Sequence, residues 1–146
     1  MSEPRCWVIV VSKNHIQRGI EGGFVQANHG KAAPLKRMKV DDWVLIYSPK
    51  VEYEGTEKLQ AFTAIGRVTG ETVYQHDMGG GFVPFRRDVT FLDSVETPIV
   101  PLVDDLTFIR DKQKWGYLFR FGFFEIPLAD LETIARHMLP AARKAA

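Results

Sequence analysis

Residues 7–50 carry WVIVVSKNH at 7–15, GGFVQANHGKAAPLKRM at 22–38 and WVLIYSPK at 43–50, and this stretch decides the fold. Its first and last segments are runs of apolar, largely β-branched residues, which predict β-strands. The middle segment crowds two amides, an imidazole and an ammonium group into positions 26–31. Strand ends that bring such groups beside aromatic rings suit a small, mostly apolar pocket with a few oriented hydrogen-bonding groups. We therefore expect a ligand-binding module.

The two predicted strands, Cys6–Val11 and Trp43–Tyr47, are each followed by a serine. The first strand is almost entirely apolar, which is typical of a central strand that is buried on both faces. Ser12 can cap a short helix that begins at Lys13, where unpaired N–H groups also favour a carbonyl or anionic ligand. The pattern fits a cap alone and a cap that also contacts a ligand equally well.

Length and charge limit the class of protein. The chain has 146 residues, the usual size of one domain, and its 19 Lys and Arg nearly balance its 18 Asp and Glu. A protein that binds a long nucleic-acid duplex should be far more basic. Any nucleic-acid contact must therefore come from a local patch, which leaves a single base, a nucleotide or a short strand as the ligand.

Cysteine content and hydropathy indicate the cellular compartment in which the protein is expected. Cys6 is the only cysteine, which excludes an intrachain disulfide, and its apolar neighbours favour a buried, inert thiol. The polar residues 1–5 do not resemble a signal peptide, and no apolar run approaches the roughly 20 residues of a membrane span. We expect a soluble, cytoplasmic protein with no membrane partner.

The rest of the chain predicts further strands and short helices. Strands are expected at Gln60–Thr69, Phe82–Leu92 and Leu118–Ile126, short helices over part of Ala33–Met38 and at Leu102–Leu106, and an amphipathic helix at Leu128–Met138. Phe108–Tyr117 is ambiguous, with a helix favoured. Five or six strands with short peripheral helices predict an α+β domain on a curved or barrel-like sheet. No repeat or linker divides the chain, so we expect one domain over residues 1–146.

Motifs for metal binding or catalysis are not found in the sequence. The four histidines form no HxH or HxxxH pair and there is no CxxC, so we expect no metal site. No serine lies in GxSxG, and Gly79–Gly81 lacks the Lys-Ser/Thr of a phosphate-binding loop. We therefore predict neither catalytic residues nor a cofactor.

The polar run Gln26-x-Asn28-His29-Gly30-Lys31 is the strongest candidate for ligand contact. Amide side chains carry a donor and an acceptor together, which suits the amide-like edge of a nucleobase, and Lys31 could meet a phosphate. A solvated loop with a turn at Gly30 is the equally compatible alternative. Among the aromatic residues, Trp115 in Lys114-Trp115-Gly116 is the least typical of a core position.

Several blocks together resemble a known family. Residues 7–50, with AFTAIGRV at 61–68, FRRDV at 85–89, PL-x-DDL-x-FI at 101–109 and WGYLFRFGFFEI at 115–126, are similar to the EVE domain family. EVE domains belong to the PUA-like superfamily, which also includes the YTH readers of methylated adenosine in RNA and the ASCH domains. The resemblance implies a PUA-like, partly open β-barrel of five to six strands with short peripheral helices.

The resemblance also implies a pocket for one nucleobase, expected to be a modified one, in DNA or RNA. We therefore predict a non-enzymatic module whose partner is modified DNA, modified RNA or a free modified nucleotide. The base-binding pocket is expected to include Trp7, Ser12, Asn14, Asn28, His29, Tyr47, Ser48 and Trp115. Flanking phosphates are expected to meet Lys13, Lys31, Arg86 and Arg87. Strand alternation puts the two arginines on opposite faces, so at most one of them can serve a given groove.

Two alternatives remain open. ASCH relatives include an amidohydrolase that acts on an acylated cytidine through a lysine and an acid, and Lys13 or Lys31 with Glu21 could imitate that pair. The other alternative is a protein-interaction adaptor with an empty pocket, which would expose a large apolar area without a basic rim.

Overall fold

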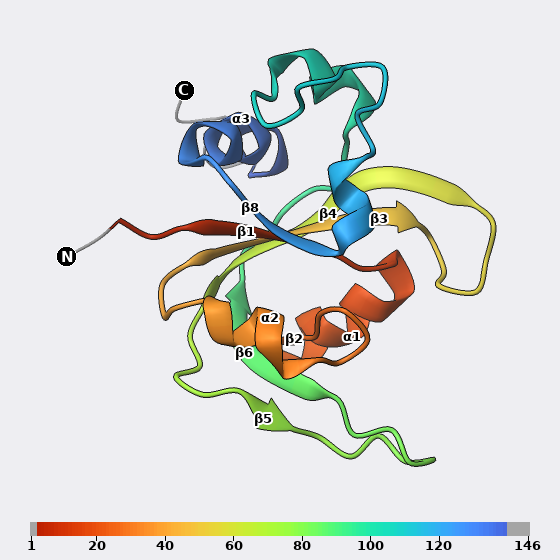
Figure 1. Cartoon of the computed structure of the whole chain (residues 1–146), viewed down its shortest axis with the longest axis vertical. Helices are drawn as coiled ribbons and strands as arrows, with labels where there is room; N and C mark the ends of the chain where they lie inside the picture. Colours follow the sequence, from red (N-terminus) through yellow and green to blue (C-terminus); the bar gives the residue numbers. More distant parts are fainter. Residues whose placement is uncertain (1–2, 140–146) are drawn as a thin grey trace.

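A curled sheet is the framework of the structure, a computed structural model that describes residues 3–139. Its main path runs in the order β2-β6-β4-β3-β1-β8, and two short strands pair alongside it (Figure 1). The strands are β1 (Cys6–Val10), β2 (Phe24–Val25), β3 (Trp43–Lys50), β4 (Lys58–Val68), β5 (Tyr74–Gln75), β6 (Phe85–Phe91), β7 (Thr97–Pro98) and β8 (Phe123–Ile126). Among these strands of residues 3–139, β1 and β3 pair parallel and the other pairs are antiparallel. The predicted α+β class with a partly open barrel is confirmed.

The central strands are buried on both faces, as the sequence predicts. Val8 on β1 belongs to one hydrophobic cluster and its neighbour Ile9 to a second cluster on the opposite face, and both are fully buried. Leu45 and Ile46 on β3 divide between the same two clusters. Because side chains alternate across a strand, one apolar run supplies two cores.

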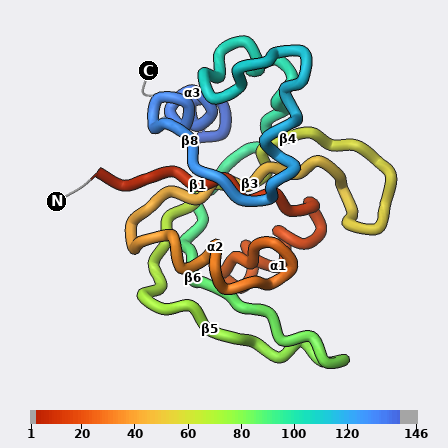
Figure 2. The backbone as a smooth tube through the Cα atoms, in the orientation of Figure 1, coloured from red at the N-terminus to blue at the C-terminus, as the bar shows by residue number. Residues whose placement is uncertain are grey.

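Helices cover both faces of the sheet. α1 (Lys13–Gly22) and α2 (Ala32–Arg37) lie on one side, and α3 (Leu128–Met138) lies on the other, beside the 3-10 helix η1 (Val100–Asp105) (Figures 1 and 2). A second 3-10 helix, η2 (Leu118–Phe121), precedes β8. No helix within residues 3–139 has the length and apolar character needed to cross a membrane.

Two predicted elements differ from the structure. The segment from Phe108 to Tyr117 is a series of turns rather than a helix, and Leu118–Ile126 divides into η2 and β8 at Gly122, whose φ is 77°. The carboxylate of Asp130 accepts hydrogen bonds from the backbone N–H groups of Thr107 and Phe108 at 2.9 Å each. This contact with α3 fixes the start of the segment, and the local sequence gives no sign of it.

Cys6 has the environment expected of an inert thiol. Its side chain is fully buried, and burial raises the pKa of the thiol, so the reactive thiolate is disfavoured.

A buried carboxylate joins the start of β1 to the turn before β3. Asp42 accepts hydrogen bonds from the backbone N–H of Arg5 at 3.0 Å, the indole Nε1 of Trp7 at 2.8 Å and the backbone N–H of Lys39 at 2.9 Å. Asp42 is only 4% exposed, so these three donors replace the water that the charge loses.

We expect Asp42→Asn to lower the free energy of unfolding by about 2–4 kcal/mol, because the new amide group would face N–H donors inside the protein. Asp41→Asn is the matched control: the neighbouring residue is exposed, and asparagine tolerates its φ of 75°. Urea denaturation should place the control within about 0.5 kcal/mol of the wild type. Equal losses for the two variants would contradict the role given to Asp42.

Candidate functional site

The polar loop, which we define as residues 26–31 between β2 and α2, has a strained backbone. Asn28 and His29 have φ values of 46° and 62°, and Gly30 follows at 84°. Residues other than glycine rarely adopt the left-handed region, which costs about 1–3 kcal/mol and is found preferentially at functional sites. Consecutive left-handed residues therefore mark this loop as one whose side chains are held in place by the surrounding structure.

Two glycine contacts hold the polar loop from either side. A Cβ on Gly30 would collide with Pro84, and the Gly30 carbonyl accepts a hydrogen bond from Phe85 N at 2.9 Å. A Cβ on Gly122 would collide with the side-chain oxygen of Asn28, so this amide lies directly against the junction of η2 and β8. Close approach to Pro84 requires glycine at position 30, and the positive φ favours glycine at both positions.

The start of α1 is tied to the β3–β4 hairpin through Asn14. Its Oδ1 accepts hydrogen bonds from the Ser12 hydroxyl at 2.7 Å and from Tyr53 N at 3.2 Å, and its own N–H donates to Val51 O at 2.9 Å. Ser12 occupies the N-cap position, but its hydroxyl makes no capping hydrogen bond. The interpretation of Ser12 as a side-chain cap is wrong, because the hydroxyl donates to Asn14 instead.

A cluster of flat rings brings the helix start and the polar loop together. The Tyr53 ring stacks on His15, with centroids 5.2 Å apart, and meets His29 edge-on at 6.4 Å. Tyr53 is half exposed, and the Lys50 ammonium lies 5.8 Å from its centroid. Of the predicted residues, His29 thus contacts the Tyr53 ring and Asn14 holds the Tyr53 backbone, and the sequence interpretation missed Tyr53 itself.

His15 and Tyr53 went unnoticed for different reasons. His15 stands next to the predicted Asn14, but its side chain matched no ligand spacing. Tyr53 lies in the polar segment 49–58, where a single aromatic residue among charged neighbours was the available signal. Partial burial and the nearby Arg18 lower the pKa of His15, so its imidazole is neutral at neutral pH, with one donor and one acceptor nitrogen.

Three predicted pocket residues are core residues. Trp7 is 1% exposed and stacks on Phe123 at 5.1 Å, and Tyr47 is 2% exposed and stacks on Phe119 at 4.1 Å. Ser48 is fully buried; its hydroxyl donates to a backbone carbonyl at 2.6 Å and shares a hydrogen bond with the Thr63 hydroxyl at 2.7 Å. None of the three has a ring face or polar group open to a ligand, so their predicted place in the base-binding pocket is corrected to the core.

The four predicted phosphate ligands have different environments. Arg87 is buried and donates to the carbonyls of Gly70, Leu35 and Met38, so it joins α2 to the sheet and is not available to a phosphate. Arg86 lies 3.8 Å over the Phe24 ring. Burial lowers the pKa of both arginines.

The predicted lysine ligands are more accessible than these arginines. The Lys13 ammonium lies 2.8 Å from a carboxylate oxygen of Glu96 in a partly exposed ion pair, and Lys31 is exposed. A phosphate could therefore reach either lysine.

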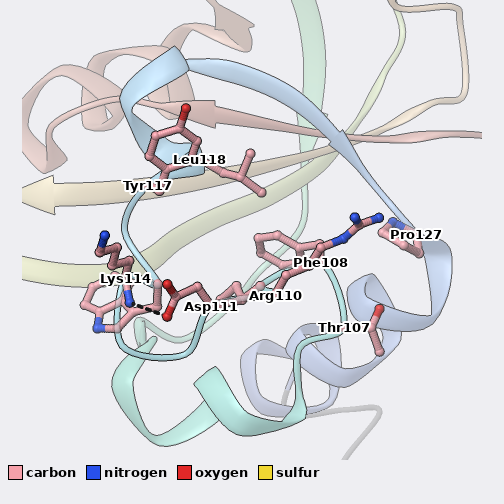
Figure 3. A pocket seen from close by; sticks show the side chains of 10 residues that line it. Thr107, Phe108, Arg110, Asp111, Lys114, Tyr117, Leu118 and Pro127 are labelled. Atoms are coloured by element: carbon pink, nitrogen blue, oxygen red, sulfur yellow. Dashed lines mark hydrogen bonds between the residues drawn. The ribbon is translucent and has the colours of Figure 1, made fainter.

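Trp115 lies apart from the polar loop. It is half-buried and lines a cavity of about 840 Å³ (Figure 3). The other lining residues are Thr107, Phe108, Ile109, Arg110, Asp111, Lys114, Tyr117, Leu118 and Pro127. None of the polar-loop residues is among them, so the predicted set of site residues divides between two places.

Comparison with known proteins gives consistent results. The EVE domain family model matches residues 5–137. A UPF0310 protein of Mycolicibacterium vanbaalenii is 53% identical over 91% of this chain and 92% of its own length. The UPF0310 protein YdcG of Bacillus subtilis is 39% identical over 90% of each chain.

Two solved structures share the fold. A hypothetical protein from Leishmania major has a TM-score of 0.55 with 16% identity, covering 92% of this chain and 94% of its own. Rpa0253 from Rhodopseudomonas palustris has a TM-score of 0.54 with 14% identity, covering 91% and 92%. At these identities the likeness concerns the architecture alone.

Gly122→Ala tests whether the polar loop depends on the contact with Asn28. We expect a loss of about 1–3 kcal/mol in unfolding free energy, because the new Cβ meets Asn28 and the φ of 77° disfavours alanine. The NMR signals of the Asn28 side-chain amide should shift as well. Gly116→Ala is the control, since a Cβ there has no neighbour within 4 Å and the φ of Gly116 is not positive. Unmoved Asn28 signals in Gly122→Ala would contradict this contact.

Proposed function

Since this chain belongs to the EVE domain family, which is associated with nucleic-acid binding modules, we propose that it binds nucleic acid by holding one nucleobase at the polar loop. The base is expected to be a modified one, in single-stranded DNA or RNA. Extruding a paired base costs a few kcal/mol, so unpaired or weakened sites should be preferred.

The observation that carries the proposal is the contact of His29, next to Asn28 in the polar loop, with the ring cluster of His15 and Tyr53. The left-handed backbone at Asn28 and His29 presents an amide and an imidazole from a fixed turn. Tyr53 supplies a flat ring beside His29 and His15 stacks on that ring, and stacking of a base on such a ring contributes roughly 1–3 kcal/mol per base. An amide with a ring nearby suits the hydrogen-bonding edge and the face of one base.

Ser12 and Asn14 act as positioning residues in this proposal. Their hydrogen bonds hold the Tyr53 backbone against the start of α1, which sets the place of the ring. Trp7, Tyr47 and Ser48 support the sheet beneath and take no direct part.

Flanking phosphates would be met by two lysines, one at the end of the polar loop and one at the start of α1. Lys31 is the exposed last residue of the loop, and Lys13 is the partly exposed first residue of α1. The ion pair between Lys13 and Glu96 is partly exposed, so exchanging the carboxylate for a phosphate costs little. With so few cations, affinity should fall only shallowly with salt: neutralising about two phosphates gives a slope near −1.4.

Single-residue variants can test the site by fluorescence anisotropy with labelled oligonucleotides that carry one modified base, each against its unmodified counterpart. Asn28→Ala should weaken binding of the preferred oligonucleotide by about 5- to 100-fold, because one base-reading contact is worth about 1–3 kcal/mol. His137→Ala, an exposed histidine on α3, serves as the control and should bind like the wild type. The proposal fails if no oligonucleotide binds more tightly than millimolar, or if Asn28→Ala leaves the affinity unchanged.

The amidohydrolase alternative now rests on a different pair of residues. Within residues 3–139 no ion pair joins Glu21 to Lys13 or Lys31; Lys13 instead pairs with Glu96. We expect no turnover of an acylated cytidine when the reaction is followed by chromatography. Turnover that disappears in both Lys13→Met and Glu96→Gln would replace the binding proposal with the enzyme.

A further inference from the structure

The cavity at Trp115 is bounded by the Thr107–Leu118 segment and Pro127. Its volume of about 840 Å³ falls within the range of small-molecule sites, roughly 300–1,000 Å³. Phe108, Trp115 and Tyr117 supply aromatic surface, and Figure 3 places Lys114 and Pro127 at opposite ends of the view. The only ring partner of Trp115 within residues 3–139 is Phe119, edge-on at 6.4 Å.

The segment that forms this cavity is fixed although it lacks α-helix and strand. Asp130 accepts the Thr107 hydroxyl at 2.7 Å in addition to the two backbone N–H groups described above. The Lys112 ammonium donates to the carbonyls of Val103 at 3.0 Å and Leu106 at 2.8 Å, which secures the segment to the end of η1. Irregular loops held this firmly are common at binding sites.

Positive charge exceeds negative charge in the cavity lining. Unlike Lys112, the side chains of Arg110 and Lys114 make no hydrogen bond or ion pair with any residue from 3 to 139. Asp111 is the one acid in the lining, and its Oδ1 already accepts the backbone N–H groups of Gln113 at 3.0 Å and Lys114 at 3.2 Å. Two cations against one engaged carboxylate favour an anionic group on the ligand.

We propose that this cavity is a second binding site, which takes a nucleotide with its planar base against the aromatic walls and its phosphate at Arg110 or Lys114, the cations toward its two ends. Aromatic faces attract flat rings, and charge-assisted hydrogen bonds from arginine or lysine are the usual contacts of phosphate. The cavity shares no lining residue with the polar loop, so this site does not depend on the function proposed for that loop.

Tryptophan fluorescence offers a direct test, because Trp7 is buried and Trp43 lies under the Arg67 guanidinium, whereas Trp115 lines the cavity. Adenosine 5′-monophosphate should change the emission saturably and bind about tenfold more tightly than adenosine, which lacks the phosphate. Trp115→Phe should abolish the signal while calorimetry still detects binding.

The double variant Arg110→Ala, Lys114→Ala should remove the advantage of the monophosphate over adenosine. The matched control is Lys36→Ala, Arg136→Ala, which removes two exposed cations from α2 and α3 and should bind like the wild type. Equal affinity for the monophosphate in the two double variants, or no saturable change in the wild type, overturns the cavity site.

Asn28→Ala separates the two sites. The fluorescence titration with the monophosphate should be unchanged in this variant, and loss of the fluorescence change would reassign the binding to the polar loop.

A short single-stranded oligonucleotide then identifies the source of the nucleotide. Affinity that falls in both Asn28→Ala and the Arg110, Lys114 double variant supports a neighbouring nucleotide of the same strand in the cavity. Oligonucleotide affinity that falls in the double variant but not in Asn28→Ala supports a nucleotide that binds in the cavity by itself.

Discussion

The parallel pairing of β1 with β3 is the constraint on which the rest of the structure depends. Both strands are buried on both faces, so each face of the sheet needs a covering layer. Parallel neighbours also require a long crossover, and here it contains α1, β2, the polar loop and α2. The strained turn at Asn28 and His29 is therefore part of a connection that the sheet itself makes necessary, and it lies beside strand ends rather than in a free surface loop.

Buried polar groups join this crossover to the sheet. Arg87 reaches from β6 to the carbonyls of Leu35 and Met38 around α2, and Asp42 binds the turn before β3 to Trp7 on β1. Each is a charge held inside the protein by several hydrogen bonds. Burying the charge costs free energy, but the hydrogen bonds to it are strongly directional and fix one arrangement. These contacts hold α2 and the turn before β3, the part of the crossover that follows the polar loop.

The region of η2 connects the two proposed sites. Phe119 contacts Trp115 at the cavity and stacks on Tyr47 in the core, and Gly122, at the end of η2, lies against Asn28 in the polar loop. One short helix and its closing glycine thus contribute to both places. A base at the polar loop and a nucleotide in the cavity would lie on either side of the same structural element.

The sequence alone determined the strands at the centre of the sheet, the amphipathic helix at Leu128–Met138, the family and the polar loop, because each shows in a local pattern of apolar or polar residues. The tertiary structure decided which side chains are available to a ligand. Trp7, Tyr47 and Arg87 face inward because their partners come from distant segments. Asp130 on α3 holds the start of the Phe108–Tyr117 segment, a contact that no local sequence pattern predicts. Tyr53 and His15 meet only when the β3–β4 hairpin folds against α1. The hydrophobic periodicity of the sequence indicates on which face of its own strand or helix a residue lies, whereas these contacts depend on how separate elements pack together.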